Sequence, residues 1–154
     1  KIMCKLCMRF DVRKVDYKTD EKLRSLLEDI CEKDEYQSLG IISFLEPNGR
    51  PGSTAAVEEH CIKSGIAFDR WCEANQECAA QYRIYRPGKN PIDAIVDVDV
   101  EENPYVRCDT ITEILTDKTL TDKEKVRRLL NYSNKVDFPC PLITDYRSSL
   151  ETAG

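Results

Sequence analysis

The sequence predicts an α+β fold that is rich in helices and carries only a small β element. Residues 2–10 and 92–101 alternate apolar and polar side chains with the period of two that is typical of half-buried strands. Elsewhere, apolar residues recur at three- and four-residue spacing, as they do on the buried face of amphipathic helices. We therefore expect about five or six helices, with the two strands as candidates to pair with each other.

The chain has the size and composition of one folded domain. It has 154 residues, of which 41% are hydrophobic and 33% are charged, which is enough to bury its own core. We assign residues 1–136 to this domain. Residues 137–154 are expected to form an extended C-terminal arm, which packs on its own domain or on a second copy in a homo-oligomer. The longest apolar runs are far too short to span a bilayer, so no membrane association is expected.

The N-terminal strand contains a CxxC motif at Cys4 and Cys7. Alternation along a strand places these two thiols on opposite faces, whereas zinc needs three or four convergent ligands. A second pair of ligands is available as His60 with Cys61, or as Cys72 with Cys78. Zinc bound by Cys4, Cys7, His60 and Cys61 is thus the one cofactor hypothesis, and otherwise no cofactor is expected.

Two apolar segments follow the first strand. Asp20 is positioned to cap a helix that runs to about Lys33. The buried face of this helix is expected to consist of Leu23, Leu26, Leu27, Ile30 and Cys31. Residues 36–46 are apolar and predict a second helix, with a strand as the alternative. Residues 47–52, PNGRPG, predict a turn.

Residues 53–82 hold the strongest helical signals in the chain. Ser53 or Thr54 can cap a helix that ends at Gly65, and a second helical pattern runs from residue 66 towards residue 74. The spacing of small residue, glycine and large apolar residue is that of a helix-turn-helix, whose second helix enters the major groove of DNA. This interpretation predicts that Arg70 and Gln76 reach the bases. A plain helical corner is the alternative.

Short motifs in the same region resemble a known family. The run GRPGS at residues 49–53, and the run DRW at residues 69–71 followed by Tyr82, resemble segments of the small terminase subunits of tailed phages. This resemblance implies a protein that binds DNA through a helix-turn-helix and assembles into rings. It assigns no site residue.

The distribution of charge along the chain places any contact with a polyanion outside residues 53–82. The net charge is −5, and residues 53–82 carry more carboxylates than cations, whereas phosphate binding needs a basic surface. After a short helix from Asp109 or Thr110 through Leu115, Thr121 and Glu124 form a capping box that begins another helix. This helix has the most basic face of the chain. Its cations are Lys123, Lys125, Arg127 and Arg128, and its expected buried stripe is Val126, Leu129 and Leu130. A solvated helix face is the alternative to a polyanion contact.

The second strand carries a row of acids. Asp97, Asp99 and Glu101 alternate with valines, and such carboxylates can hold Mg²⁺ or Mn²⁺. An amphipathic strand with a solvated acidic face is favoured, because no Gly-rich phosphate loop accompanies the acids.

Catalytic motifs are missing from the sequence. His60 is the single histidine, and the chain contains no P-loop, GxGxxG, HExxH or GxSxG motif. We therefore expect a protein that is not an enzyme.

Three functional hypotheses follow. The first is a non-catalytic, nucleic-acid-associated protein of phage or viral type that binds DNA. The alternative is a protein-interaction or host-modulating module, whose acidic surface and C-terminal arm bind a partner protein. The second alternative is a secreted effector in which the eight cysteines form disulfides. We favour reduced thiols in the cytoplasm, because cysteines lie within apolar helical patterns, as small hydrophobic residues do.

Overall fold

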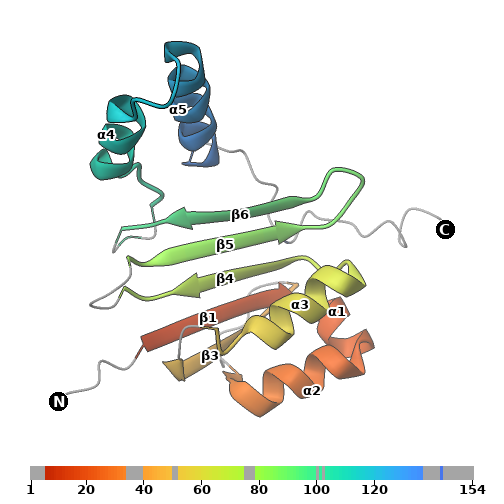
Figure 1. Ribbon diagram of the computed structural model, residues 1–154. Coiled ribbons are helices and arrows are strands. Elements are labelled where there is room, and N and C mark those ends of the chain that lie inside the picture. Colours follow the sequence, from red (N-terminus) through yellow and green to blue (C-terminus); the bar gives the residue numbers. More distant parts are fainter. Residues whose placement is uncertain are drawn as a thin grey trace.

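The computed structural model describes residues 6–33, 40–49, 52–74, 79–99, 101, 103–136 and 143 (Figure 1). In chain order the elements are β1 (Leu6–Arg13), α1 (Lys14–Thr19), α2 (Glu21–Ile30), β2 (Glu32–Lys33), β3 (Ile41–Gly49), α3 (Ala55–Ser64), β4 (Phe68–Cys72), β5 (Gln81–Arg86), β6 (Ile92–Asp97), α4 (Cys108–Thr116) and α5 (Asp122–Val136). All six strands belong to one antiparallel sheet with the order β2-β3-β1-β4-β5-β6.

The sheet, rather than the helices, organises the fold. The α+β class holds, but the predicted helix-rich fold with a small β element is wrong, because one sheet runs through the whole domain (Figure 1). The predicted strands at residues 2–10 and 92–101 correspond in part to β1 and β6. They do not pair with each other, since β4 and β5 lie between them.

The first misassigned segment is residues 36–46. The structure has the strand β3 at Ile41–Gly49, so the strand alternative is the correct one; residues 34–39 lie outside the described part. Ile42 and Phe44 are buried under the helices, whereas Ser43 and Leu45, which alternate with them along the strand, lie on the other face of the sheet. Because both faces of this strand carry apolar residues, its period of two is masked in the sequence.

The predicted helix-turn-helix is also absent from residues 53–74. Gly65 ends α3 in the left-handed conformation with a φ of 65°, as its C-cap pattern predicts. The chain then continues as β4, which pairs with β1 on one side and with β5 on the other. Two flanking ladders and the burial of Phe68 outweigh the helical pattern of a short segment.

The core lies between α1, α2 and α3 and the face of the sheet formed by β3, β1 and β4 (Figure 1). Side chains alternate along a strand, so Phe10, Phe44 and Phe68 point to these helices. The largest fully buried side chains are Phe10, Phe44, Phe68, Leu23, Leu27, Ile42, Val12, Val57 and Cys61. The residues that alternate with these along β1 and β4, such as Asp11 and Asp69, lie on the opposite face of the sheet.

The capping predictions for Asp20 and for Thr121 with Glu124 are confirmed, whereas Thr54 precedes α3 without a side-chain capping bond. The Asp20 carboxylate accepts a hydrogen bond of 2.8 Å from the Leu23 N–H and begins α2. Before α5, the Glu124 carboxylate accepts from the Thr121 N–H at 2.9 Å, and the Thr121 hydroxyl accepts from the Glu124 N–H at 3.3 Å. α4 and α5 form a helical hairpin beyond β6 (Figure 1). Of the predicted C-terminal arm the structure describes only Ile143, whose side chain is buried.

Candidate functional site

Arg70, one of the two residues predicted to read DNA, is not exposed on a helix. Arg70 lies on β4, only 12% of its side chain is exposed, and its Nε is 2.9 Å from Oε1 of Glu58. Gln76 lies outside the described residues. Arg70 is therefore held in the fold by an ion pair, and it is not placed to reach bases.

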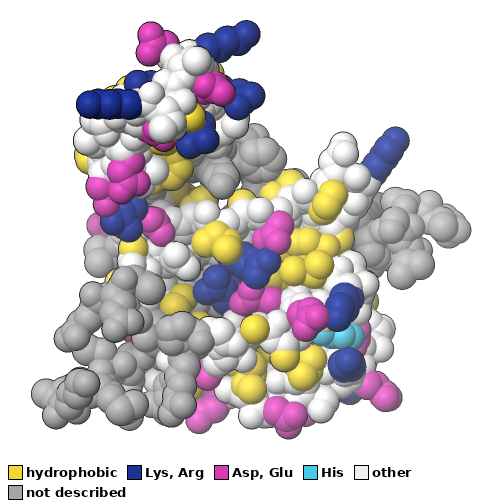
Figure 2. Space-filling view, in the orientation of Figure 1, with side chains coloured by type: hydrophobic (Ala, Val, Ile, Leu, Met, Phe, Trp, Pro, Cys, Tyr) yellow, Lys and Arg dark blue, Asp and Glu magenta, His cyan; other side chains and the backbone are white. Residues whose placement is uncertain are grey.

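Arg70 belongs to a chain of ionic contacts between α3 and the sheet. Glu58 of α3 pairs with both Arg70 and Arg83, and its carboxylate accepts a hydrogen bond of 2.6 Å from the Thr54 hydroxyl. Arg83 also donates two hydrogen bonds, of 2.9 and 2.8 Å, to Asp93 on β6. These bonds, together with the charge of Glu58, raise the pKa of Arg83 although partial burial opposes the shift. Figure 2 shows basic and acidic side chains side by side between α3 and β6.

The three predicted zinc ligands that the structure describes, Cys7, His60 and Cys61, are not brought together. Cys4 lies outside the described residues, and Cys7 is on β1. His60 turns to α2, where its Nε2 is 2.9 Å from Oδ2 of Asp20, while Cys61 is fully buried in the core and burial raises the pKa of its thiol. No group of three or more metal-ligating side chains occurs among the described residues. The five described cysteines are free thiols.

The sheet face opposite the helices carries a pair of acids. Asp11 on β1 and Asp69 on β4 are direct partners in the antiparallel register. Arg9 pairs with Asp11 at 3.2 Å, and Arg86 pairs with Asp69 at 2.7 Å. Burial raises the pKa of Asp11 and the charge of Asp69 adds to the shift, although hydrogen bonds from Ser43 and Arg9 oppose it. Oδ1 of Asp11 is buried without a hydrogen-bond partner, so this carboxylate is ionised at a cost to stability.

Replacing Asp11 with asparagine is expected to stabilise the protein at neutral pH. A carboxyl group whose pKa is raised by folding binds its proton more tightly in the native state, so its contribution to stability falls as pH rises above the ordinary value of 3.8. A shift of one pKa unit corresponds to about 1.4 kcal/mol. We expect Asp11→Asn to raise Tm by a few degrees at pH 7, and the gain to vanish below about pH 4. Thermal unfolding followed by circular dichroism over this pH range measures both.

Asp99→Asn is the matched control, and its expected effect on Tm at neutral pH has the opposite sign. Asp99 is fully exposed, and the N–H groups of Asn103 and Glu101 lower its pKa despite a small opposing desolvation. Asp99→Asn should therefore lower Tm at neutral pH, and that loss should disappear as pH falls through the pKa of Asp99. An Asp11→Asn variant that is less stable than the parent at pH 7 would contradict the buried-charge assignment.

The side chains of α5 that are exposed differ from those that the sequence predicts. The sequence predicts a buried stripe of Val126, Leu129 and Leu130, but Val126 and Leu130 are each 57% exposed. Leu129 is the half-buried member of the predicted stripe. A hollow of about 700 Å³ follows the exposed side, and its described lining residues all belong to residues 121–131. α5 therefore presents an apolar stripe that none of the described helices covers.

Cations flank this stripe. Lys123 and Arg127 lie one turn apart on the same side as Val126 and Leu130, and they line the same hollow. The other two predicted cations, Lys125 and Arg128, are also on α5. None of the four forms an ion pair with a described carboxylate, in contrast to Arg70, Arg83 and Arg86 of the sheet. We call the surface formed by Lys123, Val126, Arg127 and Leu130 the α5 face.

Comparison with known protein families, with curated proteins and with solved structures finds no match for this chain. The resemblance to small terminases therefore stays a prediction from short motifs. None of the described helices is long and apolar enough to cross a membrane.

The sequence indicated the basic residues of α5 but not the ionic clusters of the sheet. Glu58 and Arg83 are 25 residues apart, and Arg86 and Asp69 are 17 residues apart. One signal could have located β5, which carries half of these residues. Residues 81–86, QYRIYR, alternate Tyr82 and Ile84 with Arg83 and Tyr85, as a strand does.

Proposed function

We propose that this protein is a non-catalytic binding module that engages an acidic, amphipathic helix of a partner protein through the α5 face. The observation that carries the proposal is the exposure of Val126 and Leu130, 57% each, between the unpaired cations Lys123 and Arg127. The proposal keeps the protein-interaction alternative of the sequence, but it moves the binding surface from the acidic side of the molecule to a basic helix.

The apolar stripe favours a protein partner. Val126 and Leu130 are one helical turn apart, so a partner helix with two apolar residues at the same spacing covers both. Burying a Val or Leu side chain contributes roughly 1.5–3 kcal/mol. A phosphate backbone offers no apolar surface in return, and the net charge of −5 opposes the approach of nucleic acid as a whole.

The cations select an acidic partner. Lys123 and Arg127 border the stripe and form no ion pair with a described carboxylate. Glu124 is the one acid among the described residues that line the same hollow, and its pKa is lowered by hydrogen bonds from Thr121 and by the charge of Arg127. Acidic residues beside the apolar ones of a partner helix therefore complement the two cations. The same charges disfavour a symmetric dimer through this face, because the cations of two copies would meet.

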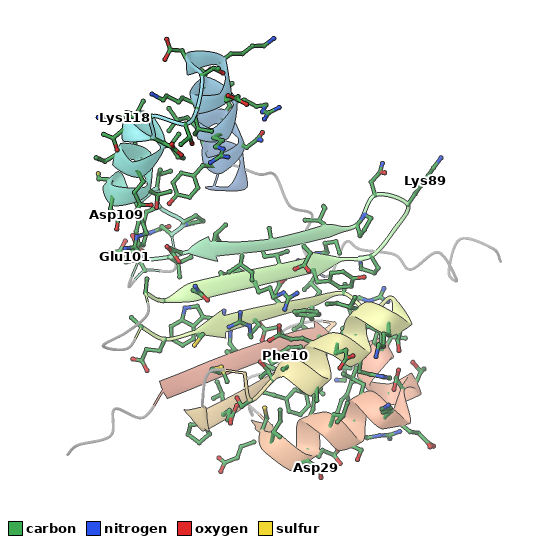
Figure 3. All side chains as sticks on the ribbon, viewed as in Figure 1. Phe10, Asp29, Lys89, Glu101, Asp109 and Lys118 are labelled. Carbon is green, nitrogen blue, oxygen red and sulfur yellow. The ribbon has the colours of Figure 1, made fainter. Side chains whose placement is uncertain are left out.

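The test is binding of a labelled synthetic helix that carries leucines one turn apart and glutamates on both sides, followed by fluorescence anisotropy. We expect Leu130→Ser and Arg127→Glu each to weaken binding at least tenfold. Leu130 is exposed, so the stability of Leu130→Ser should stay within about 0.5 kcal/mol of the parent. Lys89→Glu is the matched control, because it makes the same charge change on the β5–β6 turn, away from α5 (Figure 3), and it should bind as the parent does.

Two results would overturn the proposal. The first is the absence of binding to the acidic helix at millimolar concentration. The second is binding of duplex DNA with a steep salt dependence, lost in Arg127→Glu but retained in Leu130→Ser. The latter would instead support the nucleic-acid hypothesis, with Lys123, Lys125, Arg127 and Arg128 as phosphate contacts.

A further inference from the structure

The two cations of the α5 face lie on the same side of its apolar stripe. An α-helix advances by about 100° per residue, so a residue three positions before another lies about 60° from it in the direction in which the helix turns. Lys123 precedes Val126 by three positions, and Arg127 precedes Leu130 by three positions. With the N-terminus of α5 at the top, both cations therefore lie to the left of the stripe for a viewer outside the molecule.

The described residues that border the stripe on its other side are not basic. Asp122, four positions before Val126, and Ser133, three positions after Leu130, lie on that side, and both are exposed. The hollow follows the side of the cations instead, because Asn131 lines it whereas Asp122 and Ser133 do not. The α5 face is therefore basic on one side only.

The other two cations of α5, Lys125 and Arg128, act on the turn that precedes the helix. Neither lines the hollow, and Lys125 is half-buried. Hydrogen bonds from Thr119 lower the pKa of Asp117 in this turn, and the charges of Arg128 and Lys125 add to the shift against an opposing desolvation. Among the four cations, only Lys123 and Arg127 therefore belong to the α5 face.

A face that is basic on one side discriminates between the two directions in which a partner helix can run. Two helices that meet face to face match left with left when they are antiparallel, and left with right when they are parallel. An antiparallel partner of α5 thus needs its acidic residues three positions before its apolar ones, as the cations are on α5. A parallel partner needs them three positions after the apolar ones.

We propose that the partner helix runs antiparallel to α5 and has the pattern acidic–x–x–apolar–acidic–x–x–apolar. This inference rests on the proposed function, to which it adds the direction and the residue order of the partner. The acidic residues face Lys123 and Arg127, while the apolar residues cover Val126 and Leu130. The antiparallel direction is favoured because it brings the positive N-terminal end of the partner beside the negative C-terminal end of α5.

The test compares two labelled peptides of identical composition, each stapled as a helix so that affinity does not follow helicity. The forward peptide repeats Glu-Ala-Ala-Leu three times, and the reversed peptide repeats Leu-Ala-Ala-Glu three times. We expect the forward peptide to bind at least threefold more tightly in fluorescence anisotropy. A nitroxide on its N-terminus should broaden the amide signals of residues 130–136 in NMR spectra of the protein, and a nitroxide on its C-terminus those of residues 121–124.

A variant that moves one cation across the stripe is the matched control. Arg127→Ser combined with Ser133→Arg keeps the composition and the net charge, and both positions are exposed, so the variant should keep the circular dichroism spectrum and the Tm of the parent. It should bind the two peptides within 1.5-fold of each other, because cations now lie on both sides of the stripe.

The outcomes separate this inference from the proposed function. Binding of both peptides with equal affinity to the parent, or broadening that shows the forward peptide parallel to α5, would overturn the inference alone. The same holds if the double variant still prefers the forward peptide threefold. Failure of both peptides, together with failure of the helix that carries glutamates on both sides, would overturn the proposed function as well.

Discussion

Replacing Glu58 with alanine is expected to lower the free energy of unfolding by about 3–5 kcal/mol, the typical cost of removing one partner from a buried ion pair. Arg70 and Arg83 lie directly opposite each other on β4 and β5, and their side chains are only 12% and 19% exposed. Glu58 is the carboxylate that both of them contact. Without it, Arg70 loses its one ion pair among the described residues, and the two cations repel each other across the ladder.

Urea unfolding measures this loss, with the fluorescence of Trp71, the single tryptophan, as the probe. The midpoint should fall while the dependence on urea concentration stays constant, as it does when stability alone changes. Glu59→Ala is the matched control one residue away, because Glu59 pairs with Lys63 on the surface, where both side chains are more than half exposed. Glu59→Ala should leave the urea midpoint close to that of the parent, because an exposed ion pair contributes little. A loss below about 1 kcal/mol for Glu58→Ala would show that solvent reaches the two arginines.

Glu58→Gln separates the contribution of the negative charge to stability from that of the side-chain shape. The amide keeps the length of the side chain and an oxygen that accepts from the Thr54 hydroxyl. It removes the negative charge that Arg70 and Arg83 share. We expect a destabilisation between those of Glu59→Ala and Glu58→Ala, since part of the loss comes from the hydrogen bond and part from the uncompensated charge.

Features that depend on a few neighbouring residues could be predicted from the sequence. Asp20 caps α2, Gly65 ends α3, and Thr121 with Glu124 begins α5, as their patterns predict. In each case the donor and acceptor lie within four residues of each other. The geometry then follows from local backbone conformation alone.

Features that depend on distant pairing could not be predicted. β4 is a strand because β1, almost sixty residues earlier, and β5 provide ladders on both of its sides. Asp11 and Asp69 become neighbours through the same register. On α5 the cations could be listed from the sequence, but the predicted burial of Val126 and Leu130 is wrong, since burial depends on whether another element covers the helix. The surface that carries the proposed function is thus the place where the helical pattern and the tertiary structure disagree.

Replacing Phe68 with alanine is expected to lower the free energy of unfolding by about 3–5 kcal/mol, the range for large-to-small substitutions of buried aromatic residues. Phe68 is fully buried at the start of β4. Its ring stacks between Phe10 and Tyr85, with centroid distances of 5.0 and 5.5 Å, so the cavity would lie between two strands rather than at the edge of the core. The Arg83 guanidinium lies 5.8 Å from the centre of the same ring and would lose that contact as well.

The same urea titration measures the effect of Phe68→Ala, and it also tests the identity of β4. Ile62→Ala is the control, because Ile62 is a large apolar residue of the preceding helix with 37% of its surface exposed. Its loss should stay well below that of Phe68, since few atoms would leave a cavity. A second variant, Phe68→Leu, should cost less than Phe68→Ala because it keeps most of the buried volume. If Phe68→Ala and Ile62→Ala were equally mild, Phe68 would not lie between β1 and β5, and residues 68–72 would not be the inner strand of this sheet.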